Sequence, residues 1–198
     1  MPIPLTRSLL AELEVSLQAI RAPIADLWNP GLPPAAVDAR LASLGLTAPD
    51  ELRLWWSWHD GVDESAPFRK RVLGNGWVPL SLERAIENTL VARAMDDSTM
   101  ANTSWSPDWV TILEDVATPR IAAACDAPAS GLATIHLYDP ERVMDPDRPR
   151  LGSLGDLVTL WLSLLRDGTW SIEPQTGEFG LVDLELHERF PGDLASLL

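Results

Sequence analysis

Apolar residues recur at helical spacing throughout the first sixty positions of the chain. Residues 6–20 place four of them on one face of a helix: Leu10, Leu13, Leu17 and Ile20. A second helix begins at Pro33 and Pro34, because proline fits the first helical turn, and it ends at Gly45. Its apolar positions are Val37, Leu41 and Leu44. The spacing therefore predicts a helical N-terminal half.

Residues 47–60 have the strongest helical pattern. Thr47 is expected to be the N-cap, and Asp50 three residues later is expected to return the hydrogen bond, as in a capping box. Gly61 is expected to supply the left-handed residue that ends the helix. Four residues fall on one face at i, i+3, i+4 and i+7: Leu52, Trp55, Trp56 and His59. We expect this helix to lie at the centre of the core.

The pattern then changes from helices to strands and turns. We predict a loop over residues 62–71 and a tight turn at Asn75 and Gly76. Residues 77–80 have the apolar, branched character of a strand. Since Pro79 cannot donate to a ladder, this strand is predicted to be short or to lie at a sheet edge.

Strand signals dominate the second half of the chain. Residues 81–95 first form one more helix, whose inward positions are Leu82, Ile86 and Leu90. Three apolar or alternating runs follow the polar loop 96–107, at residues 108–113, 120–125 and 132–138. These runs fit an antiparallel meander.

A closing helix and a last hairpin complete the predicted elements. Ser153 and Asp156 form a capping box, and the buried positions after it are Leu154, Leu157, Trp161, Leu164 and Leu165. Residues 169–173 and 179–186 form a hairpin, although the second run also fits a helix. No internal repeat or long linker divides the chain. We predict a single domain over residues 1–198 of the α+β class, with a mainly antiparallel central sheet flanked by helices.

Charge and cysteine content narrow the class of protein. Lys and Arg total 15 against 29 Asp and Glu, a formal charge of −14, so nucleic acid is not an expected partner because phosphate binding needs clustered cations. The excess acid serves solubility or complements a basic partner. A single cysteine, Cys125, excludes a disulfide framework and indicates a reducing compartment. With no signal-like N-terminus and no apolar run of about 20 residues, we expect a cytoplasmic protein without a membrane partner.

The common motifs of catalytic and metal sites are absent from the sequence. It contains no glycine-rich phosphate loop, no Cys/His zinc spacing and no His-Glu-x-x-His motif. His59 and Cys125 are better explained as packed residues than as a base and a nucleophile. The specific signals of these sites are therefore absent, and we expect no cofactor and no metal.

Carboxylates provide the candidate site. Three interpretations are open: turn and cap hydrogen bonds, which account best for a typical member, a negative surface that faces a basic partner, and an acid/base pair of a hydrolase. One tryptophan in a loop joins them, because exposed Trp is enriched at binding hot spots, although it also fits a role in pinning its loop. The candidate partner-binding residues are Asp60, Asp63, Glu64, Trp105, Glu114, Asp115, Asp126 and Asp139.

Several segments follow one another in a distinctive order. A Trp-rich helix ends in a polar residue plus glycine, and a proline-containing strand leads into a Ser-Leu-Glu helix start. A Trp-bearing strand then precedes a short apolar strand, an Asp…Gly turn and a closing Ser-Leu-x-x-Leu helix. The segments are 32–33 or 46–52 at the start, then 55–61, 79–83, 109–112, 120–122, 126–131 and 153–165.

This order resembles the SUKH superfamily, whose members include the yeast cell-wall assembly regulator and many bacterial immunity proteins. The resemblance covers about residues 30–170, between an N-terminal helix in 1–29 and a C-terminal extension in 171–198. The chain departs from the family at Asp60, where Asn is common, and in the longer connection at 114–118.

The resemblance implies a non-enzymatic binding domain, often an immunity protein that neutralises a toxin from neighbouring bacteria. The partner would then be a basic toxin domain, for example a nuclease, which is basic because it holds a polyanion. Two alternatives are a regulatory or scaffold protein of the same fold that binds an endogenous protein, and a small hydrolase with paired carboxylates.

Overall fold

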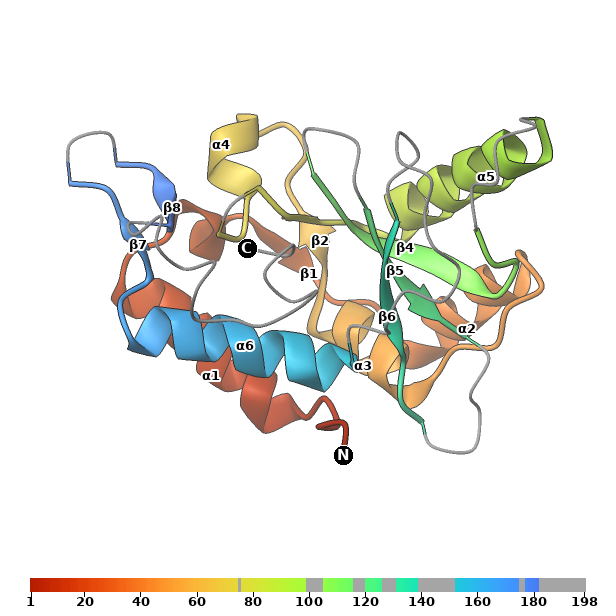
Figure 1. Cartoon of the computed structure of the whole chain (residues 1–198), viewed down its shortest axis with the longest axis horizontal. Helices are drawn as coiled ribbons and strands as arrows, with labels where there is room; N and C mark the ends of the chain where they lie inside the picture. Colours follow the sequence, from red (N-terminus) through yellow and green to blue (C-terminus); the bar gives the residue numbers. More distant parts are fainter. Residues whose placement is uncertain are drawn as a thin grey trace.

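The protein is an α+β fold, as predicted. A computed structural model of the chain describes residues 1–74, 76–98, 105–115, 120–125, 131–138, 152–174 and 177–181. Its helices are α1 (Arg7–Ala19), α2 (Pro34–Ala42), α3 (Asp50–Trp58), α4 (Phe68–Arg71), α5 (Leu82–Ser98) and α6 (Leu154–Arg166), with a 3₁₀ turn at Pro23–Asp26 (Figure 1). Its strands are β1 (Trp28–Pro30), β2 (His59–Val62), β3 (Val78–Pro79), β4 (Trp109–Glu114), β5 (Arg120–Ala124), β6 (Ile135–Tyr138), β7 (Trp170–Ile172) and β8 (Phe179–Leu181).

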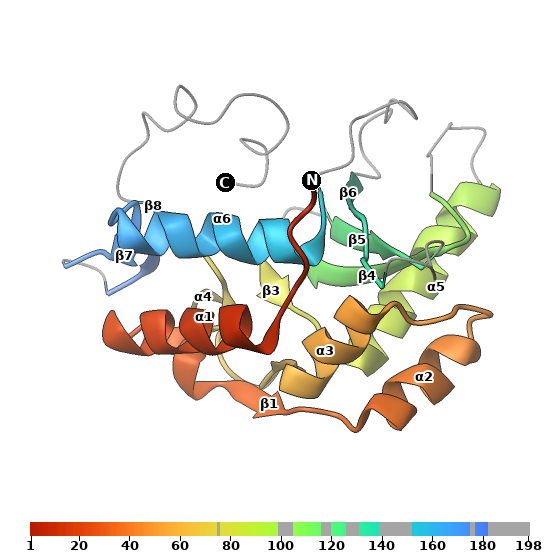
Figure 2. The ribbon, with the colours of Figure 1, turned by 90° about the horizontal axis from the view of Figure 1, so that it is seen from below.

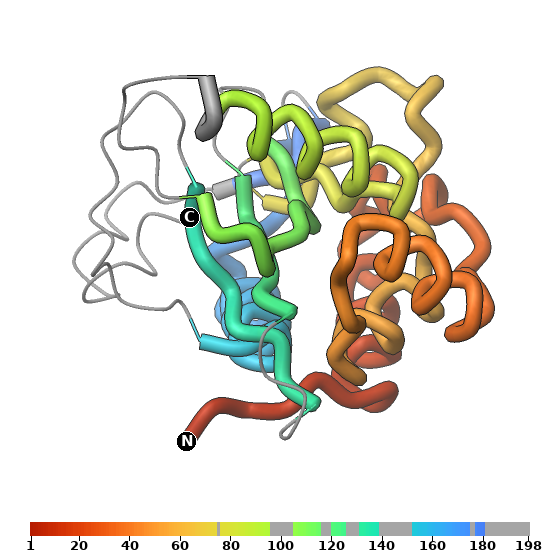
Figure 3. The backbone as a smooth tube through the Cα atoms, turned by 90° about the vertical axis from the view of Figure 1, so that its right-hand side faces the viewer, coloured from red at the N-terminus to blue at the C-terminus, as the bar shows by residue number. Residues whose placement is uncertain are grey.

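An antiparallel sheet in the order β3-β4-β5-β6 forms the largest described sheet, and β1-β2 and β7-β8 form two smaller pairs. The meander predicted from the sequence is confirmed by the β4–β5 and β5–β6 pairings. Helices α1 and α6 lie side by side (Figure 2), and α2 and α3 lie on the side of the molecule opposite β6 (Figure 3). One continuous apolar core joins the helices to the sheet.

Tryptophans form the centre of that core, as the helical spacing predicted. The rings of Trp55 and Trp161 lie 6.4 Å apart, and those of Trp161 and Trp170 lie 6.2 Å apart. Trp56 is fully buried and donates its indole N–H to the carbonyl of Leu80 at 3.1 Å. A buried indole N–H usually has a hydrogen-bond partner. This bond therefore fixes the position of α3 relative to the residue that follows β3.

The start and end of α3 differ from the prediction. The predicted capping box of Thr47 and Asp50 is wrong, because the N-cap is Pro49 and Asp50 pairs with Arg53 at 2.6 Å instead. The helix ends at Trp58, and His59 begins β2. Gly61 has a positive φ of 67° but lies inside β2. A Cβ added to it would stand 2.2 Å from the backbone nitrogen of Ser81, so the glycine is required by a close approach of two backbones rather than by a helix end.

The inward face of helix α5 agrees with the prediction only in part. Leu82 is buried and Ile86 is partly buried, as expected, but Leu90 is 51% exposed, and the other buried positions are Ala85, Asn88, Thr89 and Ala92. The Thr89 hydroxyl donates to the carbonyl of Ala85 at 2.7 Å and accepts the backbone N–H of Thr111 on β4 at 3.0 Å. Small side chains let the helix approach the strand closely, which a periodicity based on large apolar residues did not detect.

Other local predictions have mixed outcomes. The Ser153–Asp156 capping box opens α6, as predicted, and Thr6 is the N-cap of α1 at the start of the predicted helix. The loop predicted for residues 62–71 is wrong in its second half, where α4 forms, and the pair β1–β2 was not foreseen. The predicted last hairpin is present as β7–β8, while residues 182–186 lie outside the described part of the chain.

A buried carboxylate ties three distant segments together. Glu51 on α3 is 3% exposed and accepts the backbone N–H groups of Leu5 at 2.5 Å and Ala133 at 2.6 Å. The backbones of Leu154 and Gly155, at the start of α6, also hydrogen bond to it. Burial raises the pKa of Glu51 above 4.5, and these backbone hydrogen bonds act in the opposite direction.

Removing this carboxylate is expected to destabilise the protein strongly. Glu51→Ala leaves buried N–H groups without an acceptor, and we expect a loss of about 3 kcal/mol or more in the free energy of unfolding, measured by urea denaturation. Glu12→Ala is the matched control, because Glu12 is an exposed partner of Arg166 on the helix surface. Equal stability of the two variants would show that Glu51 is not needed.

The raised pKa of Glu51 also predicts a pH dependence. The folded protein binds the Glu51 proton more tightly than the unfolded chain, so the free energy of unfolding falls as the pH rises from about 4.5 through the raised pKa, and this group adds no slope above that. Glu51→Gln removes that part of the slope, and Glu12→Gln retains it. Denaturation curves between about pH 4 and 8 measure the difference.

Candidate functional site

A polar pocket of about 290 Å³ opens beside the edge strand β3. Its wall is the backbone segment that runs from Val78 to Leu80. Four charged side chains from different parts of the chain complete the lining: Glu64, Arg71, Arg84 and Glu114. The pocket therefore brings two carboxylates and two guanidiniums to one edge of the sheet.

Strand β3 is an edge strand, because it has a single hydrogen-bonded neighbour among the described strands, although both of its residues are buried. It pairs antiparallel with β4, with Val78 opposite Glu114 and Pro79 opposite Leu113. Pro79 has no N–H to offer a further strand, as predicted for an edge position. The main-chain N–H of Leu80 is used internally, since it donates to the carbonyl of Ile112 at 3.1 Å. Side chains therefore dominate the chemistry of the pocket.

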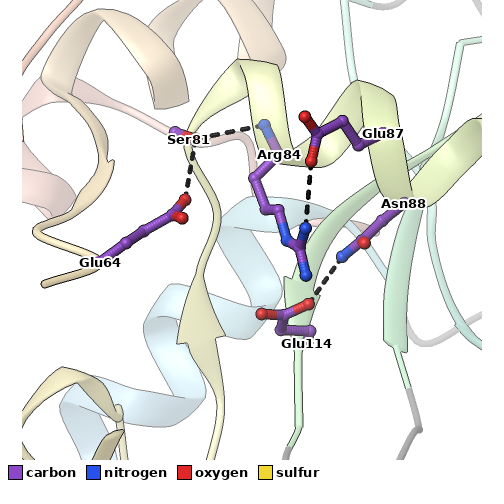
Figure 4. A network of polar contacts seen from close by, with 6 residues as sticks. All are labelled: Glu64, Ser81, Arg84, Glu87, Asn88 and Glu114. Atoms are coloured by element: carbon purple, nitrogen blue, oxygen red, sulfur yellow. Dashed lines mark hydrogen bonds and ion pairs between the residues drawn. The ribbon is translucent and has the colours of Figure 1, made fainter. Parts of the chain in front are cut away.

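The charged side chains are held by a network that is centred on α5 (Figure 4). Arg84 donates to Glu87 at 3.0 Å, and Asn88, one turn on, donates to Glu114 on β4 at 2.7 Å. The Ser81 hydroxyl lies 3.4 Å from Glu64. The bond to Glu87, followed by the attraction of Glu114 and then of Glu87 and Glu64, raises the pKa of Arg84, so its guanidinium stays charged among these acids.

Asp60 has a structural role next to this network. Its carboxylate accepts the backbone N–H of Leu82 at 2.7 Å, at the first turn of α5. Ser81 accepts the N–H of Arg84 at 3.2 Å in the same turn. Two of the N–H groups that a helix leaves unpaired are thereby satisfied. Of the predicted contacts, Asp60 is thus occupied with positioning the helix that carries Arg84.

Asp63 lies in an exposed turn, two residues beyond Gly61. Its carboxylate accepts from the backbone N–H and the hydroxyl of Ser65, at 2.9 and 2.7 Å. These bonds, chiefly the hydroxyl, lower the pKa of Asp63, and the charge of Arg71 adds to the effect. Asp63 thus stabilises its turn through Ser65 and is also exposed, so its negative charge is available to a partner.

The remaining predicted residues are placed differently. Asp115 lies near Gly76, where an added Cβ would come within 2.7 Å of its Oδ1. Trp105 is only 6% exposed and packs edge-on against Trp109 and Tyr138 at 5.6 and 4.9 Å. It has the packing role, and we leave it out of the contact surface. Asp126 and Asp139 lie outside the described residues.

Four residues of the pocket network were missed from the sequence: Arg71, Arg84, Glu87 and Asn88. A signal was present for three of them, since Arg84, Glu87 and Asn88 stand at i, i+3 and i+4 and therefore share one helix face. The remaining requirement was the register of α5 over β4, which brings Asn88 to Glu114 across 26 positions of sequence.

The chemistry of the pocket favours ion-pair recognition over hydrolysis. An acid/base pair needs one carboxyl group to keep its proton, which an apolar pocket or a second unpaired carboxylate achieves. Glu64 and Glu114 instead share their pocket with two guanidiniums. Within the described residues, no group of three or more His, Cys, Asp or Glu side chains could hold a metal ion.

The sequence matches no protein-family model, and no curated protein matches it. None of the helices in the described ranges is long and apolar enough to cross a membrane. The resemblance to the SUKH superfamily therefore stays a prediction from the order of the motifs.

The capping role of Asp60 leads to a stability prediction. Asp60→Ala removes the acceptor for Leu82 and is expected to lower the free energy of unfolding by about 1 kcal/mol, while Asp60→Asn keeps an acceptor oxygen and loses less. Asp63→Ala is the control, since its bonds are confined to an exposed turn. Urea denaturation provides the measurement, and an Asp60→Ala variant as stable as wild type would contradict the capping role.

Proposed function

We propose that this protein is a non-enzymatic binding protein that uses the pocket beside β3 to hold basic side chains of a protein partner. The best-fitting role is that of an immunity protein that neutralises a toxin domain. The observation that carries the proposal is the convergence of Glu64 and Glu114 on one polar pocket beside the edge strand β3, with Glu87 paired to Arg84 of the pocket lining.

Preorganisation of these acids supports the proposal. Glu114 is oriented by Asn88, and Glu87 by Arg84, so their side chains lose little freedom when a partner binds. Arg71 and Arg84 line the pocket together with the carboxylates, so the pocket presents charges of both signs. A partner must match that pattern, which contributes specificity in addition to attraction.

Net charge supports the same partner chemistry. A formal charge of −14 attracts a basic partner over several ångströms and raises the rate of association. Toxin domains that act on nucleic acid are basic because binding phosphate needs clustered cations. This acidic protein lacks such an excess of cations and complements them instead. The same pocket also suits an endogenous basic protein, and a growth assay separates this alternative from immunity.

The growth assay first asks whether a toxin gene lies beside the gene of this protein, and then co-expresses the protein with the toxic domain of that neighbour. We expect wild-type protein to restore growth and the pocket variant Glu64→Lys/Glu114→Lys to lose this effect, because two positive charges replace two negative ones in the pocket. Glu12→Lys is the matched control on the far helix α1. Failure of the wild type to rescue growth would count against immunity.

Binding kinetics test the electrostatic part separately. With the purified toxic domain, we expect the association rate to fall about tenfold or more between about 50 and 500 mM salt, and to fall in the pocket variant at low salt. Association that is insensitive to salt would contradict the role of these acids.

A further inference from the structure

A second pocket, of about 350 Å³, lies between α1 and α3, and shares no lining residue with the pocket beside β3. Helix α1 contributes residues at i, i+3, i+4 and i+7, and α3 contributes residues at i, i+3 and i+4, so each helix presents one face to the same groove. The lining residues are Arg7, Leu10, Ala11 and Glu14 from α1, and Leu54, Ser57 and Trp58 from α3. Its volume falls within the range of small-ligand sites.

One end of this groove is rich in acceptors. Glu14 receives the indole N–H of Trp58 at 3.3 Å, and its Oε2 lies 3.8 Å from Nε2 of His59. Nδ1 of His59 lies 3.1 Å from the carbonyl of Asn29, which can only accept, so Nδ1 carries the proton. In the neutral ring Nε2 is then an acceptor that faces a second acceptor.

Three buried polar atoms in this region make no hydrogen bond within the described residues. They are Nε2 of His59, the hydroxyl oxygen of Ser57, and Nε1 of Trp28, whose ring stacks on His59. Burial lowers the pKa of His59, which keeps the ring neutral and its Nε2 lone pair available. A carboxylate, an imidazole nitrogen with a free lone pair and a hydroxyl therefore lie near one another, and the carboxylate of Glu14 is the charged group among them.

Aromatic rings surround the same end. The rings of Trp28 and His59 stack at 4.9 Å with an angle of 7°, and Trp58 lies 4.9 Å from Trp28 and 4.5 Å from His59. The faces of such rings attract cations. A group with several N–H donors and a positive charge fits this end, and an alkylammonium is the simplest one.

The opposite end carries the opposite charge. Arg7 stands seven residues before Glu14 on α1, which separates the two backbone positions by about 10 Å along the helix axis. Between them the groove is apolar, and Ala11 leaves room that a larger side chain would fill. A guanidinium binds carboxylates through two parallel hydrogen bonds.

We propose that the groove between α1 and α3 binds an ω-amino carboxylate, with its ammonium at Glu14 and Trp58 and its carboxylate at Arg7. The alkyl chain lies along Leu10, Ala11 and Leu54. Two sources have this chemistry: a free ω-amino acid and the C-terminal lysine of a polypeptide. This site is separate from the pocket beside β3, and the proposal does not depend on the function proposed for that pocket.

Titration of the full chain with 6-aminohexanoate tests the proposal, with tryptophan fluorescence and calorimetry as readouts. We expect saturable binding with a Kd at or below about 1 mM. Hexanoate, hexylamine and 1,6-diaminohexane each lack one of the two matching charges, and each is expected to bind at least about tenfold more weakly. Absence of saturation at about 10 mM 6-aminohexanoate, or equal binding of all four compounds, would overturn the proposal.

Variants assign the two ends of the ligand. Glu14→Gln is expected to weaken 6-aminohexanoate and hexylamine but not hexanoate, and Arg7→Gln to weaken 6-aminohexanoate and hexanoate but not hexylamine. Glu12→Gln is the control on the same helix, since Glu12 pairs with Arg166 instead. Unchanged binding in both groove variants would overturn the assignment, and their thermal melts confirm that they fold.

A pair of peptides distinguishes the two sources. One peptide ends in lysine with a free carboxylate, and the other has the same sequence with an amidated end. Tighter binding of the free-carboxylate peptide than of 6-aminohexanoate assigns the site to a chain end, and the reverse order assigns it to a free amino acid. Equal binding of the amidated and free peptides would contradict a carboxylate contact at Arg7.

Discussion

The carboxylate of Glu51 is the interaction on which the described fold depends most. Buried in α3, it accepts backbone N–H groups from the N-terminal segment, from the residues that lead into β6 and from the start of α6. Burying a charge is costly, and here several hydrogen bonds offset the cost. The segments that Glu51 joins also approach each other closely. A Cβ added to Gly155 at the start of α6 would stand 2.1 Å from the carbonyl oxygen of Ile3.

Acidic residues serve three different purposes in this protein. Glu51 organises the interior, Asp60 caps α5, and Glu64 with Glu114 lines a pocket that is open to a partner. These uses are linked, because Asp60 positions the helix from which Arg84 and Asn88 reach the pocket. The net charge of −14 is therefore only partly a surface property, since Glu51 lies in the interior.

Helix α3 connects the core to both candidate sites. Trp55 and Trp56 face the core, while Leu54, Ser57 and Trp58 face the groove shared with α1. The indole N–H of Trp56 donates to the carbonyl of Leu80, and Leu80 lines the pocket beside β3. One short helix thus contacts the core, the charged pocket beside β3 and the groove shared with α1. It holds the two sites in fixed positions relative to each other.

The sequence by itself determined the features that depend on neighbours within one or two turns. These are the first helix, the capping box at Ser153, the buried face of Trp55 and Trp56, the meander, and the edge position that Pro79 imposes. Local spacing sets such features directly. Tertiary structure alone decided what each acid does: Glu51 meets Ala133 across 82 positions, Asp60 meets Leu82 across 22, and Asn88 meets Glu114 across 26. A carboxylate has the same chemistry in every turn of the chain, and only the burial and the donors that distant segments bring to it assign its role.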